Sequence, residues 1–265
     1  MNKNVLLKSV TLALASAILV ACGGISSDPA APTTNPSTPE PAPTPTLPDA
    51  SSAIPQGIWQ SAVGAATTTS ALVTQDGQVW SVLTSTSTTP STTRLLKASL
   101  AARGAGFNGT GKAYVLGTTV ASATPAEAVT LSATSVSKTS LNGSITGTTT
   151  QAESFSLAYQ SRYDTPVTLA SFVGSAWSGT LGNGTVNWRI DSAGNITGTR
   201  TTGCTYSGQL SLRTEAKAVA DVVLTESCPA LTQMSGVALK TPDNTGITLM
   251  LTTTGDAAGV LIGLK

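Results

Sequence analysis

Residues 185–200 read TVNWRIDSAGNITGTR and carry the pattern that decides the fold class. Val186, Trp188 and Ile190 are apolar, and the residues between them are polar. Because every second side chain of a β-strand points to the same face, this alternation is typical of a strand with one buried face and one face in water. The run Ala193-Gly194-Asn195 then supplies residues that tolerate positive φ, which favours a hairpin into the next strand.

The same alternation recurs across the chain from residue 57 to residue 265. In its second half the pattern predicts eight short strands, at residues 177–181, 185–191, 196–201, 205–213, 219–227, 234–239, 246–253 and 259–264. Further turn signals are Asp76-Gly77, Asn108-Gly109, Asn142-Gly143 and Asn183-Gly184. Only residues 91–102 and 166–173 are compatible with a helical turn or two. We therefore predict an all-β fold built from antiparallel meanders.

An internal duplication is indicated by two similar openings. Gly57-Ile58-Trp59 resembles Gly174-Ser175-Ala176-Trp177, and each is followed by a strand with a second tryptophan, Trp80 or Trp188. We expect these four tryptophans to pack in the cores. The alternative is a binding platform for a sugar or a protein.

The duplication divides the chain into two β modules, predicted at residues 57–163 and 170–265. Eight strands of this length are typical of a small closed barrel, which has no exposed edges and an interior that is filled or holds a small ligand. A two-sheet sandwich is the alternative architecture.

The first 21 residues have the features of a secretion signal. Lys3 and Lys8 precede a short apolar run, which ends in Leu19-Val20-Ala21-Cys22. The run is too short to span a bilayer of about 30 Å as a stable helix. We therefore expect a secretion signal and not a membrane-spanning helix. A plain signal peptide with an incidental cysteine is the alternative.

Residues 22–55 are predicted to be a disordered linker rich in Pro and Thr. Nine of the 14 prolines lie between Ser26 and Pro55. Such a segment cannot bury enough apolar surface to offset its chain entropy, and it favours extended polyproline II conformations. We interpret it as a stalk that holds the β modules at a distance from the start of the mature chain. A docking site for a protein that recognises proline motifs is the alternative.

The remaining cysteines, Cys204 and Cys228, are the residues that an exported chain would oxidise to a disulfide. A loop of about 25 residues closed in this way would contribute roughly 3 kcal/mol on the chain-entropy model. The sequence has no Cys-x-x-Cys motif, so a structural bond is favoured over a redox-active pair.

Composition limits the chemistry of the chain. It contains no His, which removes the most common general base, the His-based nucleophile triads and the usual zinc ligands. The carboxylates are interpreted as solvated or turn residues; those considered are Asp221 with Glu226, Asp243 with Asp256, and the isolated Glu127, Glu153 and Asp164. We predict no enzymatic activity, no catalytic or metal-binding residues and no cofactor. Carboxylates converging in a deep cleft would instead indicate a hydrolase of the cell envelope.

Net charge argues against nucleic acid as a partner. Loss of residues 1–21 removes Lys3 and Lys8 from the 14 basic side chains and leaves all 13 acidic ones, a net charge near −1. Nucleic-acid binding rests on clustered Lys and Arg. The densest basic cluster, Arg94 with Lys97 and Arg103, is interpreted as a solvated strand face.

The motif at Cys22 resembles the lipobox of bacterial lipoprotein precursors. This resemblance implies a diacylglycerol on the sulfur of Cys22, cleavage before it, and acylation of the new amino terminus. Because Gly23 and not Asp follows the cysteine, the usual sorting rule favours the outer membrane. The expected localisation is the outer membrane, with the protein lipid-anchored at the periplasmic face or the cell surface.

The body is similar to uncharacterised proteobacterial surface lipoproteins. It more weakly resembles lipocalin-like barrels and the barrels of the factor H binding and transferrin binding lipoproteins. The function expected from these features is a non-enzymatic binding module of the envelope, whose partner besides the membrane is a protein or a small apolar ligand. The alternative is a structural or assembly component that binds other envelope proteins.

Overall fold

The computed structural model describes residues 53–85, 92–116, 126–148, 152–182, 184–228 and 230–265. The predicted leader, Cys22 and all but the end of the predicted linker lie outside the described residues. The described residues, from 53 to 265, belong to one compact unit, which contains two closed β-barrels. The prediction of an all-β fold with two antiparallel barrel modules is confirmed.

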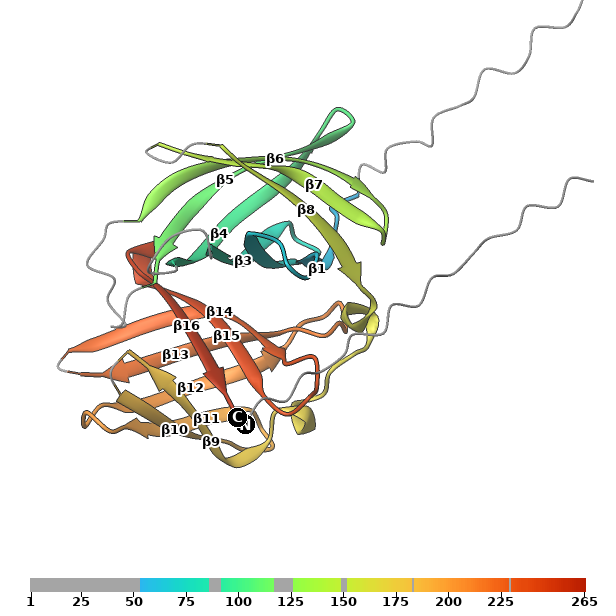
Figure 1. The fold of residues 1–265 in the computed structure, drawn as a ribbon. Coiled ribbons are helices and arrows are strands. Elements are labelled where there is room, and N and C mark those ends of the chain that lie inside the picture. The colour runs from blue at the N-terminus through green and yellow to red at the C-terminus, as the bar shows by residue number, and fades with distance from the viewer. Residues whose placement is uncertain (1–52, 86–91, 117–125, 149–151, 183, 229) are drawn as a thin grey trace, which may run out of the picture. The chain divides into compact units, whose positions relative to one another are not determined.

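The first barrel is an eight-stranded meander (Figure 1). Its strands are β1 (Gly57–Ser61), β2 (Thr67–Val73), β3 (Gln78–Ser85), β4 (Thr92–Arg103), β5 (Gly106–Val115), β6 (Glu127–Val136), β7 (Ser140–Gly147) and β8 (Glu153–Gln160). Each strand pairs antiparallel with the next one, and β1 closes the barrel against β8 with Trp59 opposite Tyr159. Closure pairs the edge strands, so the predicted sandwich alternative is wrong.

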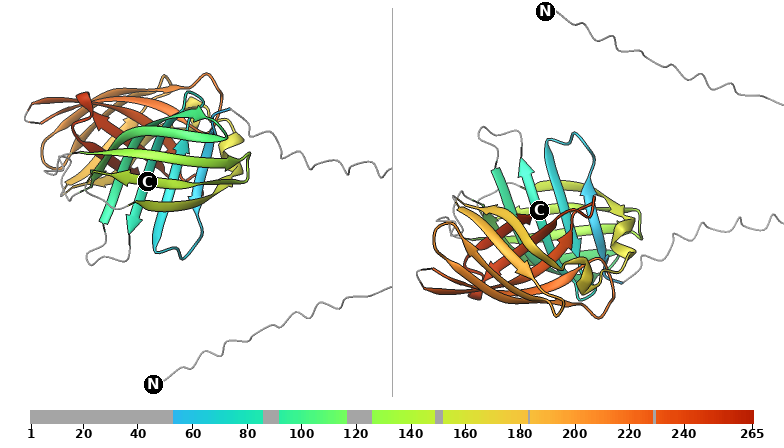
Figure 2. Two further views of the ribbon diagram at one scale, coloured as in Figure 1. Left: turned by 90° about the horizontal axis from the view of Figure 1, so that it is seen from above. Right: turned by 90° about the horizontal axis from the view of Figure 1, so that it is seen from below.

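The second barrel repeats the meander, and Figure 2 shows both barrel walls from two sides. Its strands are β9 (Gly174–Leu181), β10 (Gly184–Ile190), β11 (Asn195–Arg200), β12 (Thr205–Leu212), β13 (Ala220–Ser227), β14 (Leu231–Lys240), β15 (Ile247–Thr253) and β16 (Gly259–Leu264). All eight strands predicted in this half are present. The seam between β9 and β16 pairs Gly179 with Leu264, and two backbone hydrogen bonds join Ser178 and Lys265.

The two barrels begin in the same way, which supports the duplication. The indole N–H of Trp59 donates to the carbonyl of Pro55, and that of Trp177 donates to the carbonyl of Phe172. A side chain on Gly57 or on Gly174 would collide with the tryptophan that follows it. The second opening is one residue longer, and a register shift between β9 and β10 absorbs the extra residue as a β-bulge.

Each barrel has its own apolar interior. Trp59, Val79 and Leu96 belong to the first interior, whereas Trp188 and Ile190 belong to the second. The remaining void in the first interior is about 20 Å³, which is room for about one water molecule. The expectation of core packing holds for Trp59 and Trp188, and Trp177 packs half-buried against the second interior.

Three local predictions were wrong. Residues 92–103 form a strand and not a helix; Leu96 faces the interior and Leu95 faces outward, and both are buried, so the alternation was hidden. Asn108-Gly109 and Asn142-Gly143 lie within β5 and β7 and are not turns. A methyl group on Gly143 would lie 2.1 Å from the backbone oxygen of Ser132 and 2.7 Å from the ring of Phe155, so this glycine allows close packing of both.

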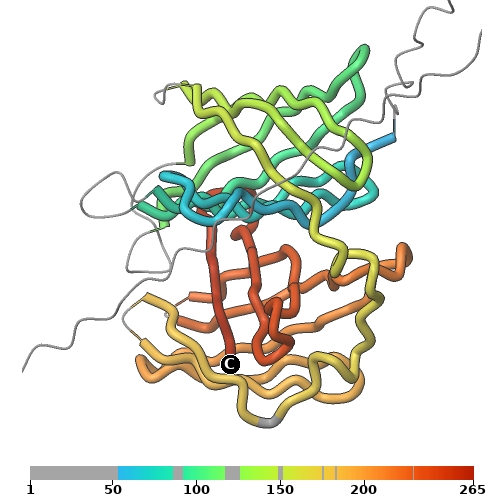
Figure 3. The backbone as a smooth tube through the Cα atoms, turned by 45° about the vertical axis from the view of Figure 1, so that its right-hand side comes forward, coloured from blue at the N-terminus to red at the C-terminus, as the bar shows by residue number. Residues whose placement is uncertain are grey.

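The segment between the barrels, residues 161–173, runs along one side of the molecule (Figure 3). It contains two short 3-10 helices, η1 (Ser161–Asp164) and η2 (Leu169–Ser171), and η2 lies in one of the two regions where helical turns were expected. Tyr163 in η1 is buried among side chains of both barrels. The linking segment is therefore part of the junction and not a free tether.

A third apolar cluster, the junction cluster, joins the outer faces of the two barrels. Its buried members are Ile58, Leu72, Trp80, Leu95, Tyr114, Tyr163, Val219, Val237, Leu239 and Met250. Trp80 lies on the outer face of β3, so it packs in an apolar core as expected, but in the core between the barrels and not in a barrel interior. Apolar contact between outer faces keeps the two barrels in one body.

Candidate functional site between the two barrels

The predicted disulfide between Cys204 and Cys228 is present. Their Cα atoms are 4.9 Å apart, and the bond ties the start of β12 to the end of β13. Cys204 is buried. These features are typical of a structural bond. The predicted lipidation residue Cys22 lies outside the described residues.

A buried polar cluster lies inside the second barrel, close to this disulfide. Arg200 pairs with Glu226 across 3.7 Å, and the Tyr206 hydroxyl donates to the same carboxylate over 2.6 Å. Burial, and then the charge and hydrogen bond of Glu226, raise the pKa of Tyr206. Arg200 also donates to the carbonyl of Leu181. The interpretation of Glu226 as a solvated residue was therefore wrong, because the pair fills one end of this interior.

Two residues of the basic cluster on β4, Arg94 and Lys97, are paired, whereas Arg103 is exposed to solvent as interpreted. Arg94 forms an ion pair with Glu153 on β8, on the inward side of the first barrel. Lys97, on the outward side, forms an ion pair with Asp256 of the second barrel. The interpretation of Arg94 and Lys97 as part of a solvated strand face, and of Glu153 as an isolated carboxylate, is thus corrected. Asp256 lies in a turn, as interpreted, but its carboxylate is paired with Lys97.

A groove of about 750 Å³ at the junction is lined by residues of both barrels. Its first wall is made by the outer faces of β3, β4 and β5, with Trp80, Ser99 and Thr110. Its second wall is made by β13 and β14, with Val223 and Ser235. Its volume lies within the range of about 300–1,000 Å³ that is typical of small-molecule sites, and such sites favour domain interfaces.

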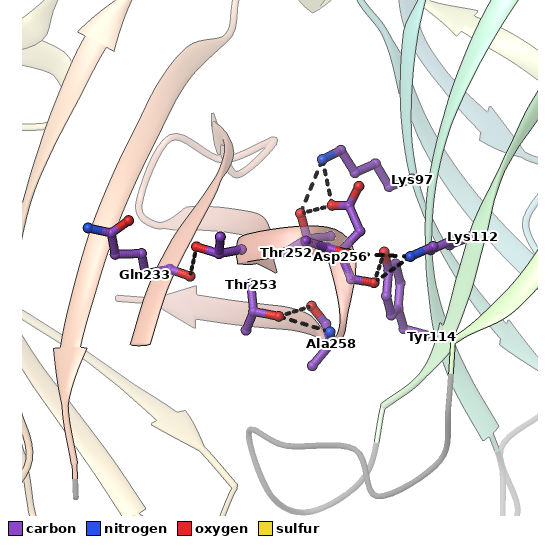
Figure 4. Close-up of polar contacts among 10 residues, drawn as sticks. Lys97, Lys112, Tyr114, Gln233, Thr252, Thr253, Asp256 and Ala258 are labelled. Atoms are coloured by element: carbon purple, nitrogen blue, oxygen red, sulfur yellow. Dashed lines mark hydrogen bonds and ion pairs between the residues drawn. The ribbon is translucent and has the colours of Figure 1, made fainter. Parts of the chain in front are cut away.

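The end of the groove near Lys97, the lysine end, is shown in Figure 4. The ammonium of Lys97 lies 2.8 Å from an oxygen of Asp256, and Thr252 donates to the same oxygen over 2.7 Å. These groups outweigh the effect of burial and lower the pKa of Asp256. From β5, Lys112 and the hydroxyl of Tyr114 donate to the backbone carbonyl of Asp256.

Asp256 adopts an unusual backbone conformation in the short 3-10 helix η3 (Thr254–Asp256). Its φ is 54°, in the left-handed region that is uncommon for residues other than Gly. Gly255 before it also has positive φ. This turn brings both the carboxylate and the carbonyl of Asp256 to the first barrel, where Lys97 and Lys112 bind them.

The opposite end of the groove, the arginine end, is acidic. Arg213 binds three carboxylates: Glu215 at 2.7 Å, Asp221 at 2.7 Å and, in the first barrel, Asp76 at 3.0 Å. Burial would lower the pKa of Arg213, but the three carboxylates outweigh burial and raise it. One cation thus faces three anions. Two of these anions, Asp76 and Asp221, line the groove with about half of each side chain exposed.

The charges at the lysine end have the opposite balance. Asp256 neutralises Lys97, whereas Lys112 donates to the carbonyls of Gly255 and Asp256 and makes no ion pair with a carboxylate of the described residues. The groove therefore carries surplus positive charge at one end and surplus negative charge at the other. Trp80, between them, is 2% exposed, and its indole N–H has no hydrogen-bond partner within the described part of the chain.

The other carboxylates considered in the sequence analysis do not come together in one site. Asp221 faces outward and Glu226 faces the interior of the second barrel. Asp243 is held in its own turn by Thr241 and Thr245. Asp164 binds Lys138 and Lys217. Across the described ranges, no three His, Cys, Asp or Glu side chains are placed to hold a metal ion.

Comparisons of the chain with family models, curated proteins and solved structures give no match. No helix in the described part of the chain has the length and apolar character needed to cross a membrane.

Proposed function

We propose that this chain is a lipid-anchored envelope lipoprotein that acts as a non-enzymatic binding module, and that the groove between its barrels is the binding site. Support for the anchor comes from the lipobox-like motif at Cys22, which is followed by a Pro-rich segment suited to a spacer. The proposed location is the outer membrane, at its periplasmic face or at the cell surface.

One observation carries the choice of site: the groove is built from both barrels, is lined in part by exposed residues, and has charged side chains at both ends. The interior of the first barrel leaves a void of only about 20 Å³. A ligand of ordinary size is therefore better accommodated in the groove than in that interior.

The anchor is tested by expressing the wild type and Cys22→Ser in a Gram-negative host. We expect the amino-terminal peptide of the mature wild type to begin at Cys22 with the mass of a triacylated cysteine, and the variant to leave the membrane fraction. An unmodified amino terminus, or unchanged partitioning of the variant, would refute the anchor.

The site is tested with a photo-activatable phenylalanine analogue in place of Ser235 in the groove, or in place of Ser207 on the outer face of β12 as a matched control. Both positions are exposed residues of the second barrel. Irradiation of living cells should give an adduct that is specific to position 235. Equal labelling at both positions, or none, would contradict the proposal. A stoichiometric adduct with one envelope protein at both positions would instead favour an assembly role.

A further inference from the structure

The groove has the charge pattern of a receptor for a linear zwitterion. Surplus negative charge comes from Asp76 and Asp221 at the arginine end, and surplus positive charge comes from Lys112 at the lysine end. A ligand with one charge of a single sign would meet repulsion at one of the two ends. A ligand with an ammonium at one end and a carboxylate at the other would be attracted at both.

The strand geometry sets the length of such a ligand. Trp80 lies opposite Lys97, and Lys97 lies opposite Lys112 on the next strand. Asp76 lies in the turn just before β3 and precedes Trp80 by four residues, so the two are separated by at most about 13 Å along the strand, and two strand spacings add about 10 Å across the sheet. The diagonal between the charged ends is thus at most about 16 Å, a span that four or five extended residues can bridge.

The lining between the two ends suits a peptide backbone. Ser99, Thr110 and Ser235 supply hydroxyl groups that can both donate and accept hydrogen bonds, and Val223 supplies an apolar surface. A peptide presents alternating N–H and C=O groups to such a lining. The sheet edges of both barrels are paired, so a peptide in this groove would contact side chains and would not be added as a strand.

We propose that the groove binds a short peptide of four or five residues with free termini. The ammonium terminus is bound by Asp76 and Asp221, and the carboxylate terminus is bound by Lys112. This inference rests on the proposed binding function of the groove and adds the class of ligand to it.

Isothermal titration calorimetry of the wild-type chain with tetra-alanine tests the proposal. We expect tetra-alanine to bind, and acetylation of its amino terminus or amidation of its carboxyl terminus each to weaken binding by about tenfold. Dialanine, which is too short to reach both ends, should bind at least about tenfold more weakly than tetra-alanine. No binding of tetra-alanine, or equal binding of free and blocked peptides, would overturn the proposal.

Two variants assign the ends. Lys112→Gln should weaken binding of free tetra-alanine but not of its amidated form, and Asp221→Asn should weaken binding of the free form but not of the acetylated form. Arg189→Gln, an exposed residue on the outer face of β10 and away from the groove, is the control and should leave binding unchanged. Unfolding curves check that each variant is folded. If a variant weakened the binding of the free peptide and of the corresponding blocked peptide equally, the assignment of the ends would be contradicted.

A neutral tetrasaccharide, maltotetraose, tests the peptide inference separately from the proposed binding function of the groove. If it binds in place of tetra-alanine and Ser235 still labels specifically in cells, the peptide inference is wrong and the binding function stands. If neither probe binds and Ser235 does not label, both are wrong.

Discussion

Lys97 of the first barrel and Asp256 of the second form an ion pair of 2.8 Å, across a junction that also buries Trp80 under the same lysine, with the ammonium 5.3 Å from the ring centroid. Single replacements Lys97→Met and Asp256→Asn should each lower the free energy of unfolding. Because the pair is partly exposed, we expect a coupling energy of about 0.5–1 kcal/mol. Urea unfolding of the wild type, both single variants and the double variant measures it. Strictly additive effects would show that the pair does not couple.

Gly259 and Gly263 offer a matched pair of substitutions on β16. A methyl group on Gly259 would lie 2.7 Å from the ring of Tyr114, whereas the same group on Gly263 would meet no atom within 4 Å. Gly259→Ala should therefore destabilise the chain by about 1–3 kcal/mol through overpacking of the junction. Gly263→Ala should change its stability much less, as thermal unfolding of both variants would show. Equal effects would indicate that the contact with Tyr114 is unimportant.

Removal of one partner from the buried pair in the second barrel should be costly. Glu226→Leu leaves Arg200 buried with its main counter-charge gone, for which we expect a loss of about 3–5 kcal/mol. Arg200→Met combined with Glu226→Leu removes both charges and should recover a large part of that loss. Denaturant unfolding of the wild type and of the two variants measures these free energies. A double variant less stable than the single one would mean that the ion pair itself stabilises the barrel.

The disulfide should stabilise the second barrel without being needed for its architecture. Cys204→Ser with Cys228→Ser should lower the free energy of unfolding by about 2–4 kcal/mol. Reductant should have the same effect on the wild type and none on the double variant. If reductant leaves the unfolding midpoint of the wild type unchanged, the bond contributes nothing to stability.

Acid should weaken the junction. The pKa values of Asp76 and Asp256 are lowered from the usual value of 3.8, because their hydrogen bonds and cationic partners outweigh burial. A carboxylate with a lowered pKa in the folded state contributes stability above the pKa of the unfolded state, and that contribution is lost as the pH falls through the folded value. The contribution of Asp76 and Asp256 to the free energy of unfolding should thus be constant above about pH 5 and decrease below about pH 4.

The double variant Asp76→Asn with Asp256→Asn isolates this contribution. The difference in unfolding free energy between it and the wild type should shrink as the pH falls from 5 to 2. A constant difference over that range would argue against ionised carboxylates at the junction.

The sequence predicted the second barrel well and the first less well, for a physical reason. In β10 the residues Val186, Trp188 and Ile190 face one interior while their neighbours face water, so alternation is visible. In β4 both Leu95 and Leu96 are buried, because one faces the second barrel and the other faces the interior. The two apolar faces erase the period of two on which the prediction rests.

The absence of alternation in a strand could itself have indicated the junction between the barrels. Consecutive buried apolar residues occur in β4, in β14 at Val237-Ala238-Leu239 and in β15 at Leu249-Met250-Leu251. A strand of an antiparallel barrel with both faces apolar must be covered on its outer side as well. These three stretches could have located the junction. The ion pairs at the ends of the groove could not be found in this way, because Asp76 and Arg213 are 137 residues apart.

The order of the strands determines what the chain exposes while it is being made. Residues 57–160 hold all eight strands of the first barrel, so this barrel can close as soon as β8 has emerged. Its outer face, with Ile58, Leu72 and Trp80, is fully covered only when β14 and β15 arrive, some 70 or more residues later. During that interval the incomplete chain exposes an apolar surface that can bind other chains. We expect its need for chaperones to end when β15 has paired.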